Sequence, residues 1–370
     1  MRSSRILFYY ILREQVKVFL LAVAAITLVM NFGALILYLQ DYNLPLGSLV
    51  RILPYHTPIL FPWIFPLAVL IAVTLTYGRL ASDNEILAMQ LAGVHLVKPV
   101  LPAVALGTAV MLSLAFIGDQ VLPWCRTREY NIFVQESEKI LVRIFETETT
   151  WQLGNYTVEW GSFEQGTLHN VSVRQHDPAT GVASAEFRAK TATYSTDGSS
   201  ITLSLRDISG TNLDEVYDIR WDSHVQGFPM RGVFMRSPDY KAMSTRDMLS
   251  DLDKNYGPNA PPPADAYQAE QRQRRVRDIW TRIHRMYSLS VSALALALVG
   301  VPLGLLARQA HMLSAFFLGC LPVMIVYYPT FLLGESMASE GTISAATGCW
   351  TPTVVIAAIG LGLLGWLFSK

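Results

Sequence analysis

Arginines are concentrated in one short stretch of this sequence, where guanidinium groups stand close enough together to bind anions. Arg282 and Arg285 lie nearest the uncharged run that follows, and we expect these two to contact anionic groups such as lipid headgroups. Arginines at these spacings cover more than one face of a helix, so a solvated surface is the alternative interpretation. The stretch contains Arg272, Arg274, Arg275, Arg277, Arg282 and Arg285.

A short helix is predicted over about residues 82–92, in a segment with acidic side chains. Ser82 or Asp83 can cap its start, because their side-chain oxygens accept hydrogen bonds from free backbone N–H groups. Gly93 is suited to ending the helix, since glycine readily adopts the left-handed conformation that follows many helices.

The acidic side chains of this helix stand next to apolar ones. Asp83 and Glu85 accompany an apolar stripe made by Ile86 and Met89. A helix that lies flat on a membrane is the alternative, but such helices usually carry basic residues on their polar face. The combination of acidic and apolar residues therefore predicts docking into a groove of a partner protein.

Motifs for catalysis, metal binding and cofactor binding are missing. The sequence has no G-x-x-x-x-G-K-[ST] phosphate loop and no H-E-x-x-H pair, its seven histidines are scattered, and its three cysteines form no C-x-x-C pair. Whether Cys125 and Cys349 are bridged is left open. The G-x-G-x-x-G pattern at 360–365 lies in an apolar run, so we interpret it, like Gly300-x-x-x-Gly304, as close helix packing. We expect no catalytic residue, no metal and no cofactor.

The sequence has 370 residues, and few of them are charged. Charged residues make up 16% and hydrophobic residues 51%, whereas an average soluble domain is about 25% charged. The 29 basic and 29 acidic residues cancel, which argues against nucleic-acid binding, because that class of protein needs a basic excess. Most charges lie between Asp119 and Arg285, so the rest of the chain is strongly apolar.

Six uncharged runs are each long enough to cross a bilayer, which takes about 20 apolar residues as a helix. Buried helices of a large soluble core are the alternative, but six such runs in one chain disfavour it. The runs lack the alternation of barrel strands, so only helices would satisfy their backbone in lipid. The runs are residues 18–39, 52–78, 99–118, 286–307, 312–334 and 341–369.

Lysines and arginines in the short loops predict the orientation. They are numerous in the N-terminal tail and in the loops on the same side, whereas the opposite short loops carry Arg51 alone. We therefore expect both termini in the cytoplasm and the long middle segment on the other side. The first run exceeds the 7–15 residues of a signal-peptide core, so we interpret it as a retained span.

The middle segment, residues 121–285, is predicted to be β-rich, between helical segments 1–120 and 286–370. Short alternating or β-branched stretches recur from Trp151 to Pro229. Their spacing predicts an antiparallel sandwich, jelly roll or open barrel. Turn signals separate them at Asp177-Pro178, Asp197-Gly198 and Ser209-Gly210.

Helical character returns after these strands. A helix is predicted from Ser244 to about Asn255, with Asp247 as a capping signal. A stiff proline-rich linker at 257–266 follows, and a second helix from Tyr267 runs into the fourth span.

Two stretches of the sequence carry short motifs. The first and stronger contains Phe65-Pro66-Leu67, Gly78-Arg79-Leu80, Ser82-Asp83-Asn84-Glu85-Ile86-Leu87-Ala88-Met89 and Ala92-Gly93. The second is Val301-Pro302-Leu303-Gly304 followed by Arg308-Gln309. These motifs resemble those of the Lpt lipopolysaccharide-export permeases, the paired membrane subunits of an ABC transporter. The order of three spans, a β-rich segment and three more spans also agrees, so the resemblance covers essentially the whole chain.

The resemblance implies an α+β membrane protein of the bacterial inner membrane. It would have six transmembrane helices and a periplasmic antiparallel β-jellyroll-like domain between helices 3 and 4. Such a permease subunit extracts lipopolysaccharide or a related glycolipid and passes it to periplasmic β-jellyroll bridge proteins. Its other partners would be a second permease, homologous or identical, and a cytoplasmic ABC ATPase dimer.

Two alternatives to this function stay open. A permease-like subunit would transmit ATPase motion to a periplasmic partner without moving lipid. A membrane-embedded enzyme acting on lipid or glycan is disfavoured, because no carboxylate pair or nucleophile–base constellation stands at a membrane interface.

The resemblance also implies roles for the acidic helix. Asp83, Glu85, Ile86, Met89 and Gly93 would couple the permease to the ATPase, and the family's carboxylate that meets basic residues of the ATPase corresponds to Glu85.

For the lipid path we expect Phe32 and Ile36 of the first span and Tyr327 and Tyr328 of the fifth, although ordinary packing explains these four equally well. Family members often place a cation in the outer half of the first span, where residues 30–34 have none. Lipid A phosphates would then be contacted by the pair at 282 and 285. The F-like or G-like type, the pairing partner and the lipid stay open.

Overall fold

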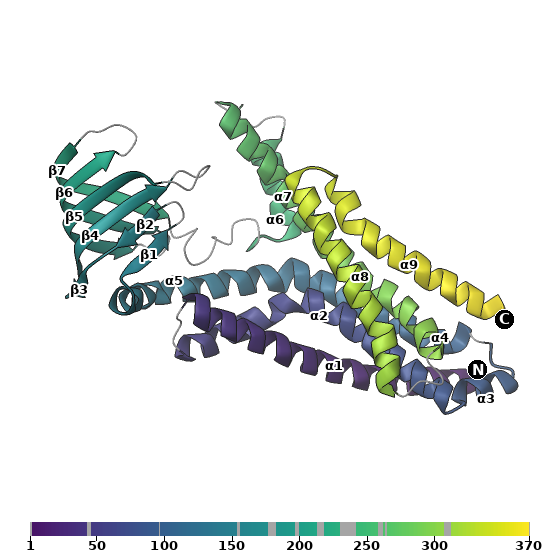
Figure 1. Ribbon diagram of the computed structural model, residues 1–370. Coiled ribbons are helices and arrows are strands. Elements are labelled where there is room, and N and C mark those ends of the chain that lie inside the picture. Colours follow the sequence, from purple (N-terminus) through teal and green to yellow (C-terminus); the bar gives the residue numbers. More distant parts are fainter. Residues whose placement is uncertain are drawn as a thin grey trace. The chain divides into compact units, whose positions relative to one another are not determined.

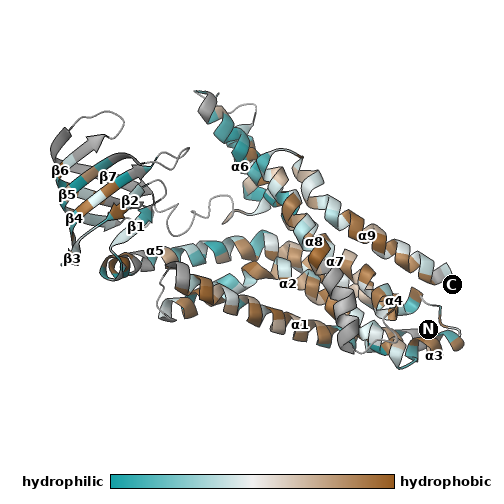
Figure 2. Ribbon diagram, viewed as in Figure 1, coloured by the Kyte–Doolittle hydropathy of each residue, from teal (hydrophilic) through white to brown (hydrophobic). Residues whose placement is uncertain are grey.

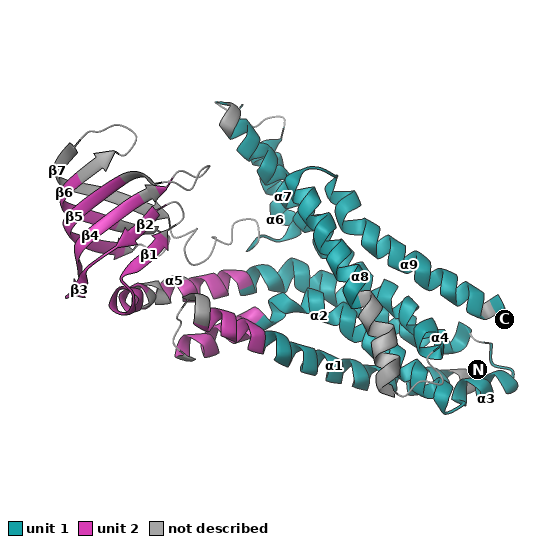
Figure 3. Cartoon of the chain, in the orientation of Figure 1, with its two compact units in different colours: residues 1–31, 57–125, 240–370 teal, residues 32–56, 126–239 magenta. Residues whose placement is uncertain are grey.

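A computed structural model describes residues 2–42, 46–95, 97–153, 156–176, 183–196, 200–212, 218–229, 242–257, 262, 265–306 and 312–369. Long helices occupy both ends of the chain and a sheet occupies the middle (Figure 1). The chain divides into two compact units (Figure 3). Unit 1 consists of residues 1–31, 57–125 and 240–370, and unit 2 of residues 32–56 and 126–239.

The N-terminal helices are long and follow one another with short connections. The helix α4 continues through one π-helical turn, η1, into α5, so that a single helical rod runs over all three. These elements are α1 (Arg2–Tyr42), α2 (Leu46–Ser82), α3 (Glu85–Leu91), α4 (Val97–Phe116), η1 (Ile117–Val121) and α5 (Leu122–Thr147).

The C-terminal helices begin with a short capped one. The helix α6 (Thr245–Tyr256) begins at Ser244, whose hydroxyl accepts a hydrogen bond from the backbone N–H of Asp247, which confirms the predicted cap. The first backbone N–H of α6 also donates to Asp119 Oδ1 in the π-helical turn, at 2.7 Å. Three long helices follow: α7 (Ala266–Leu306), α8 (Met312–Glu340) and α9 (Ala345–Ser369).

Five helical segments of the described chain are long and apolar enough to cross a membrane. Their hydrophobic residues are visible along the rods in Figure 2. The sixth predicted run, 312–334, lies within the continuous helix α8, and its role as a span stays a prediction. The five segments are Arg5–Leu39, Gly47–Ser82, Val97–Phe133, Gln268–Leu306 and Ala345–Leu367.

Small residues bring the helices of unit 1 close together. A Cβ atom at Gly304 of α7 would stand 2.6 Å from the backbone oxygen of Thr74 in α2, and one at Gly360 of α9 would stand 2.9 Å from Val299 in α7. The packing interpretation of these glycines is therefore confirmed. It does not extend to Gly362 or Gly365 of the same pattern, because both have open space beside them.

Seven antiparallel strands of unit 2 form one sheet, with β1, β2, β4, β5, β6 and β7 side by side and β3 paired to β4. The strand β2 pairs with β4 and not with β3, whereas β4, β5, β6 and β7 lie side by side in chain order and form a meander. The predicted antiparallel arrangement is confirmed, and the jellyroll stays a prediction. The strands are β1 (Thr150–Leu153), β2 (Tyr156–Glu159), β3 (Ser162–Glu164), β4 (Thr167–His176), β5 (Ala183–Thr196), β6 (Ser200–Asn212) and β7 (Asp218–Pro229).

The predicted turn at Ser209-Gly210 is wrong. Both residues lie inside β6, where Ser209 pairs with Arg188 of β5 and with Arg220 of β7. Two flanking strands supply hydrogen-bond partners to this stretch, which outweighs the turn preference of the dipeptide. The signals at 177–178 and 197–198 and most of the predicted linker at 257–266 lie outside the described residues.

At one row of residues across the sheet of unit 2, the alternation of core-facing and outward-facing side chains along the strands shifts by one residue. Asn170 of β4 and Asp207 of β6 have φ of 53° and 55°, and the paired register of the neighbouring strands skips this row. In β6, Leu205 before the row and Ile208 after it are both buried, although strict alternation would turn one of them outwards. Because of the two left-handed residues, the parts of the strands before and after this row present their apolar side chains to the same face of the sheet.

The core of unit 2 joins the sheet to α5. Phe145 of α5 has its ring 5.2 Å from that of Trp160 and 5.3 Å from that of Tyr194, and the Trp160 Nε1–H donates to the Phe145 carbonyl. A second buried contact links three helices of this unit, since Tyr38 of α1 and His56 of α2 each lie 2.9 Å from Glu129 Oε1 of α5.

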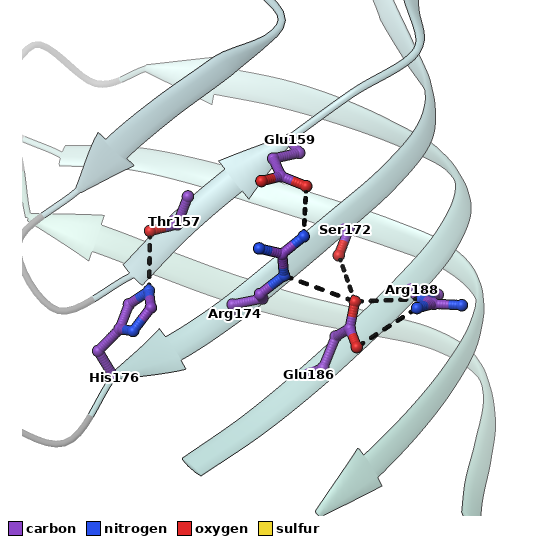
Figure 4. A network of polar contacts seen from close by, with 7 residues as sticks. All are labelled: Thr157, Glu159, Ser172, Arg174, His176, Glu186 and Arg188. Carbon is purple, nitrogen blue, oxygen red and sulfur yellow. Dashed lines mark hydrogen bonds and ion pairs between the residues drawn. The ribbon is translucent and has the colours of Figure 1, made fainter. Parts of the chain in front are cut away.

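The opposite face of the sheet carries a polar network over β2, β4 and β5 (Figure 4). Glu186 accepts hydrogen bonds from Ser172 and Arg188, and Arg174 pairs with Glu159 at 2.6 Å. Burial raises the pKa of the Glu186 carboxyl, but the hydrogen bonds from Arg188 and Ser172, with the charges of Arg188 and Arg174, outweigh it, so that the pKa is lowered overall.

Candidate functional site

The helix α3 is the element that carries the predicted docking residues. It begins later than expected, because Asn84 takes the left-handed conformation at its start (φ 56°) and makes no side-chain cap. The hydroxyl of Ser82 instead donates to the carbonyl of Arg79 at the end of α2. The predicted cap by Ser82 or Asp83 is therefore wrong: the left-handed turn at Asn84 starts the helix later, at Glu85, and the Ser82 hydroxyl bonds to the end of α2 instead.

The predicted end of this helix is confirmed. Gly93 has φ 79°, a conformation that costs little only for glycine, and its N–H donates to the Gln90 carbonyl. The N–H of Val94 reaches back to the carbonyl of Met89, which completes a Schellman motif. The short helix is thus held in a defined geometry at its C-terminal end.

The apolar stripe predicted for docking faces inwards instead. Ile86 is 8% exposed and belongs to the apolar core of unit 1, and Met89 packs against the same core. The physical reason is that burial of these side chains against the helix bundle anchors an otherwise short helix. Their roles in coupling stay predictions, but they would act by holding α3 in place.

A different apolar pair of α3 is exposed and was missed from the sequence. Leu87 is 43% and Leu91 82% exposed, and their i, i+4 spacing places them on one face of the helix. That spacing was the signal that could have identified them. Asp83 and Asn84 are also exposed at the start of α3. We call the surface of Asp83, Leu87 and Leu91 the α3 face.

The carboxylate of Glu85 lies where α1 passes the start of α3. Its Oε1 accepts a hydrogen bond from the hydroxyl of Tyr10 at 3.2 Å, and both side chains are accessible. Nearby on α1, Glu14 lies 3.3 Å from the Lys17 ammonium and 3.8 Å from the Arg79 guanidinium. The carboxylate of Glu85 thus has no cation within ion-pair distance in the described part of the chain and can receive one from a partner.

No described group of histidines, cysteines and carboxylates has a geometry suited to holding a metal ion. Cys125 and Cys349 are both buried and free, so no disulfide joins them. The chemistry of the α3 face is therefore that of a binding surface, with two exposed leucines next to the exposed carboxylate of Asp83.

A family model described as Lipopolysaccharide export system permease LptF/LptG matches residues 9–367, nearly the whole chain. The chain belongs to the LptF/LptG permease family. None of the curated proteins matches it significantly. Membership in this permease family, with several membrane-spanning helices, establishes a transport subunit of the inner membrane in lipopolysaccharide export.

The residues predicted for the lipid path of this LptF/LptG permease lie in two kinds of environment. Phe32 and Ile36 of α1 are 63% and 39% exposed, so their side chains are open to lipid or to another subunit. Tyr327 of α8 is buried and shares a hydrogen bond with Thr353 of α9, and the Tyr328 hydroxyl donates to the Trp63 carbonyl of α2. The two tyrosines join helices, and a role in the lipid path stays a prediction for all four residues.

The two arginines predicted to contact lipid phosphates are held by the LptF/LptG helix bundle. Arg285 Nη1 donates to Glu335 Oε1 of α8 at 2.5 Å, so its charge is already balanced. Arg282 is 7% exposed. Their lipid contact stays a prediction. Arg308 lies outside the described residues.

Proposed function

We propose that this chain is the permease subunit of an ABC transporter that extracts lipopolysaccharide or a related glycolipid from the inner membrane. A separate cytoplasmic ATPase dimer would bind the α3 face and supply the energy. The observation that carries this proposal is the two-sidedness of α3. Leu87 and Leu91 are exposed, while Ile86 on the opposite side packs in the core that α2, α4 and α7 share.

This arrangement supports a lever role for α3. A partner that moves the exposed leucines also moves Ile86, because the helix is a rigid unit closed by the Gly93 motif. The displacement then reaches the helices that pack around Ile86. Basic residues of the ATPase would pair with Glu85, which within the described part of the chain has only the Tyr10 hydroxyl as its partner.

A second permease subunit would complete the lipid path along α1. No residue in the most apolar window of this helix is fully buried by the described chain, and Leu21, Leu28 and Val29 are each at least 70% exposed. Such a surface suits lipid acyl chains and another helix alike. The extracted lipid would then pass along the β-sheet of the periplasmic unit to bridge proteins of similar fold, with both termini in the cytoplasm and α8 as the sixth span.

Transport is tested by reconstituting the chain with its ATPase and sister permease in liposomes that contain lipopolysaccharide. We expect ATP-dependent release of lipopolysaccharide to a soluble acceptor with a β-jellyroll fold. Release that is the same with and without ATP would contradict the proposal.

The alternative, a subunit that transmits ATPase motion without moving lipid, predicts a different response. In an exporter, lipopolysaccharide bound in the cavity stimulates ATP hydrolysis by the reconstituted complex. In a pure transmitter, hydrolysis is indifferent to lipopolysaccharide and responds to the periplasmic partner instead.

A further inference from the structure

A polar hollow lies where the turn between α8 and α9 meets α7 in unit 1. Its volume is about 510 Å³. The side of α7 contributes Arg277, Trp280 and His284, and the turn contributes Gly341 and Ser344. Trp280 is partly exposed, and large aromatic side chains of this kind gather at the headgroup level of a bilayer. A tryptophan beside the hollow is what a position at the depth of lipid phosphates would show.

Arg277 brings an unbalanced charge into this hollow. Within the described chain its guanidinium makes no hydrogen bond or ion pair, and its Nε atom is buried. A Cβ atom at Gly341 would meet the Arg277 guanidinium, so the guanidinium lies directly against the turn between α8 and α9. Arg277 as a whole is half-buried, and no described acid pairs with it, so its guanidinium is available to an anion.

Neighbouring arginines of α7 show that this condition is specific to Arg277. Arg274, close by on α7, pairs with Glu270 at 2.7 Å, and Arg285 pairs with Glu335. Acidic partners on α7 and on α8 are thus within reach of these two arginines, but none of the described acids lines the hollow.

Two kinds of hydrogen-bond donor flank the guanidinium. The indole Nε1–H of Trp350 donates to His284 Nδ1 at 3.2 Å, so the proton of a neutral His284 ring must be on Nε2, where it can be donated to an anion. The first N–H groups of α9, at Ala345 and Ala346, come before the helix's first internal hydrogen bond, which runs from Gly348 to Ser344. Both residues line the hollow.

An apolar groove adjoins the polar hollow. It has a volume of about 750 Å³ and lies between α7, α8 and α9. Ile343 lines both cavities, and the groove continues past Thr351, Val355 and Ile359 of α9, in a segment apolar enough to span the membrane. Its lining is almost entirely hydrocarbon, which suits an acyl chain and nothing charged.

We propose that these adjoining cavities bind one anionic phospholipid, with its phosphate against Arg277 and one acyl chain in the apolar groove. The unpaired guanidinium selects the negative headgroup, and the groove requires that the anion carry a hydrocarbon chain. This site is separate from the lipid path along α1 and does not rest on the proposed transport function.

The proposal is tested by native mass spectrometry of the purified full chain with added phosphatidylglycerol. We expect Arg277→Gln to weaken phosphatidylglycerol binding by at least about fivefold, the effect of one basic residue near a lipid phosphate. Arg277→Lys should retain most of the binding, because the charge is kept. Arg274→Gln is the matched control on the same helix and should leave binding unchanged.

The groove has its own pair of variants. Val355→Trp fills the groove and should weaken binding, whereas Leu361→Trp, equally exposed on α9 but outside the groove, should not. Wild-type binding by Arg277→Gln would overturn the proposal. So would phosphatidylcholine binding as tightly as phosphatidylglycerol, or millimolar inorganic phosphate displacing the lipid, which would indicate a general hydrocarbon groove or a simple anion site.

Discussion

The hydroxyl of Tyr10 in α1 donates a hydrogen bond to the Glu85 carboxylate at the start of α3, at 3.2 Å. Two segments 75 positions apart in sequence thereby meet at Glu85, the carboxylate that we propose pairs with basic residues of the ATPase. Both groups are accessible to water, so the bond contributes little to stability, about 1 kcal/mol or less. Its consequence is orientation: it holds one oxygen of the carboxylate towards α1 and leaves the other for a partner.

Replacement of Tyr10 by phenylalanine tests this orienting role. We expect Tyr10→Phe to leave thermal stability nearly unchanged and to reduce ATP hydrolysis in the assembled complex, because Glu85 loses its fixed rotamer. The neighbouring Tyr9→Phe, at an exposed residue with no described bond to Glu85, is the control. Equal hydrolysis rates for both variants would show that the bond has no role in coupling.

An aspartate introduced on the exposed face of α3 is expected to affect ATPase binding, and one introduced on the buried face is expected to affect stability. Leu91→Asp should change stability by less than about 0.5 kcal/mol, since Leu91 is exposed, yet abolish co-purification with the ATPase. Ile86→Asp should cost about 3 kcal/mol or more, because it buries an unpaired carboxylate. Thermal melts in detergent and pull-down of the ATPase separate the two effects. Normal ATPase binding by Leu91→Asp would remove the α3 face as the docking surface.

Two glycines offer a matched test of helix packing. In Gly304→Ala the new methyl group would stand 2.6 Å from the Thr74 carbonyl oxygen, so α2 and α7 must separate, at a cost of about 1–3 kcal/mol. In Gly362→Ala the methyl group meets nothing within 4 Å, and the better helix propensity of alanine should stabilise the chain by up to about 1 kcal/mol. Thermal unfolding should therefore shift in opposite directions. The same shift in both variants would contradict the predicted α2–α7 contact.

The Glu186 network predicts a pH dependence for the stability of the sheet. Because folding lowers the pKa of this carboxyl below its ordinary 4.5, its ionised form stabilises the folded state above that pH. The contribution is lost as pH falls through the folded pKa. Glu186→Gln should thus be destabilised relative to wild type at pH 7, and the gap should close below pH 4.5. A gap that persists or widens in acid would show that the network does not favour the ionised carboxylate.

The membrane helices could be predicted from the sequence because the bilayer imposes a length. A run of about 20 uncharged residues leaves the backbone no alternative to a helix, and five of the six runs are confirmed as candidate spans. The strands from 156 to 229 were recognised for a similar reason, since β-branched residues alternate there. Their ends were not recognised: the turn signal at Ser209-Gly210 is overridden by two neighbouring strands that the local sequence does not contain.

The orientation of side chains at the candidate sites depends on contacts that no local pattern contains. On α3 the stripe of Ile86 and Met89 and the stripe of Leu87 and Leu91 both fit helical spacing, and only the core of unit 1 decides which is buried. Likewise, Arg285 meets an acid 50 positions away, whereas Arg277 meets none of the described ones. The arginine cluster was visible in the sequence, but the member with a free charge was not.

The central claim, that α3 is the docking site of the ATPase, is tested most directly by reversing one charge. Co-purification of the ATPase with Glu85→Arg should be lost, while the variant keeps wild-type thermal stability, because the side chain is accessible and only the Tyr10 bond is removed. Gln90→Arg, which adds a cation at another exposed position of α3, is the control and should keep most of the ATPase. A Glu85→Arg permease that retains its ATPase and exports lipopolysaccharide at the wild-type rate would contradict the account.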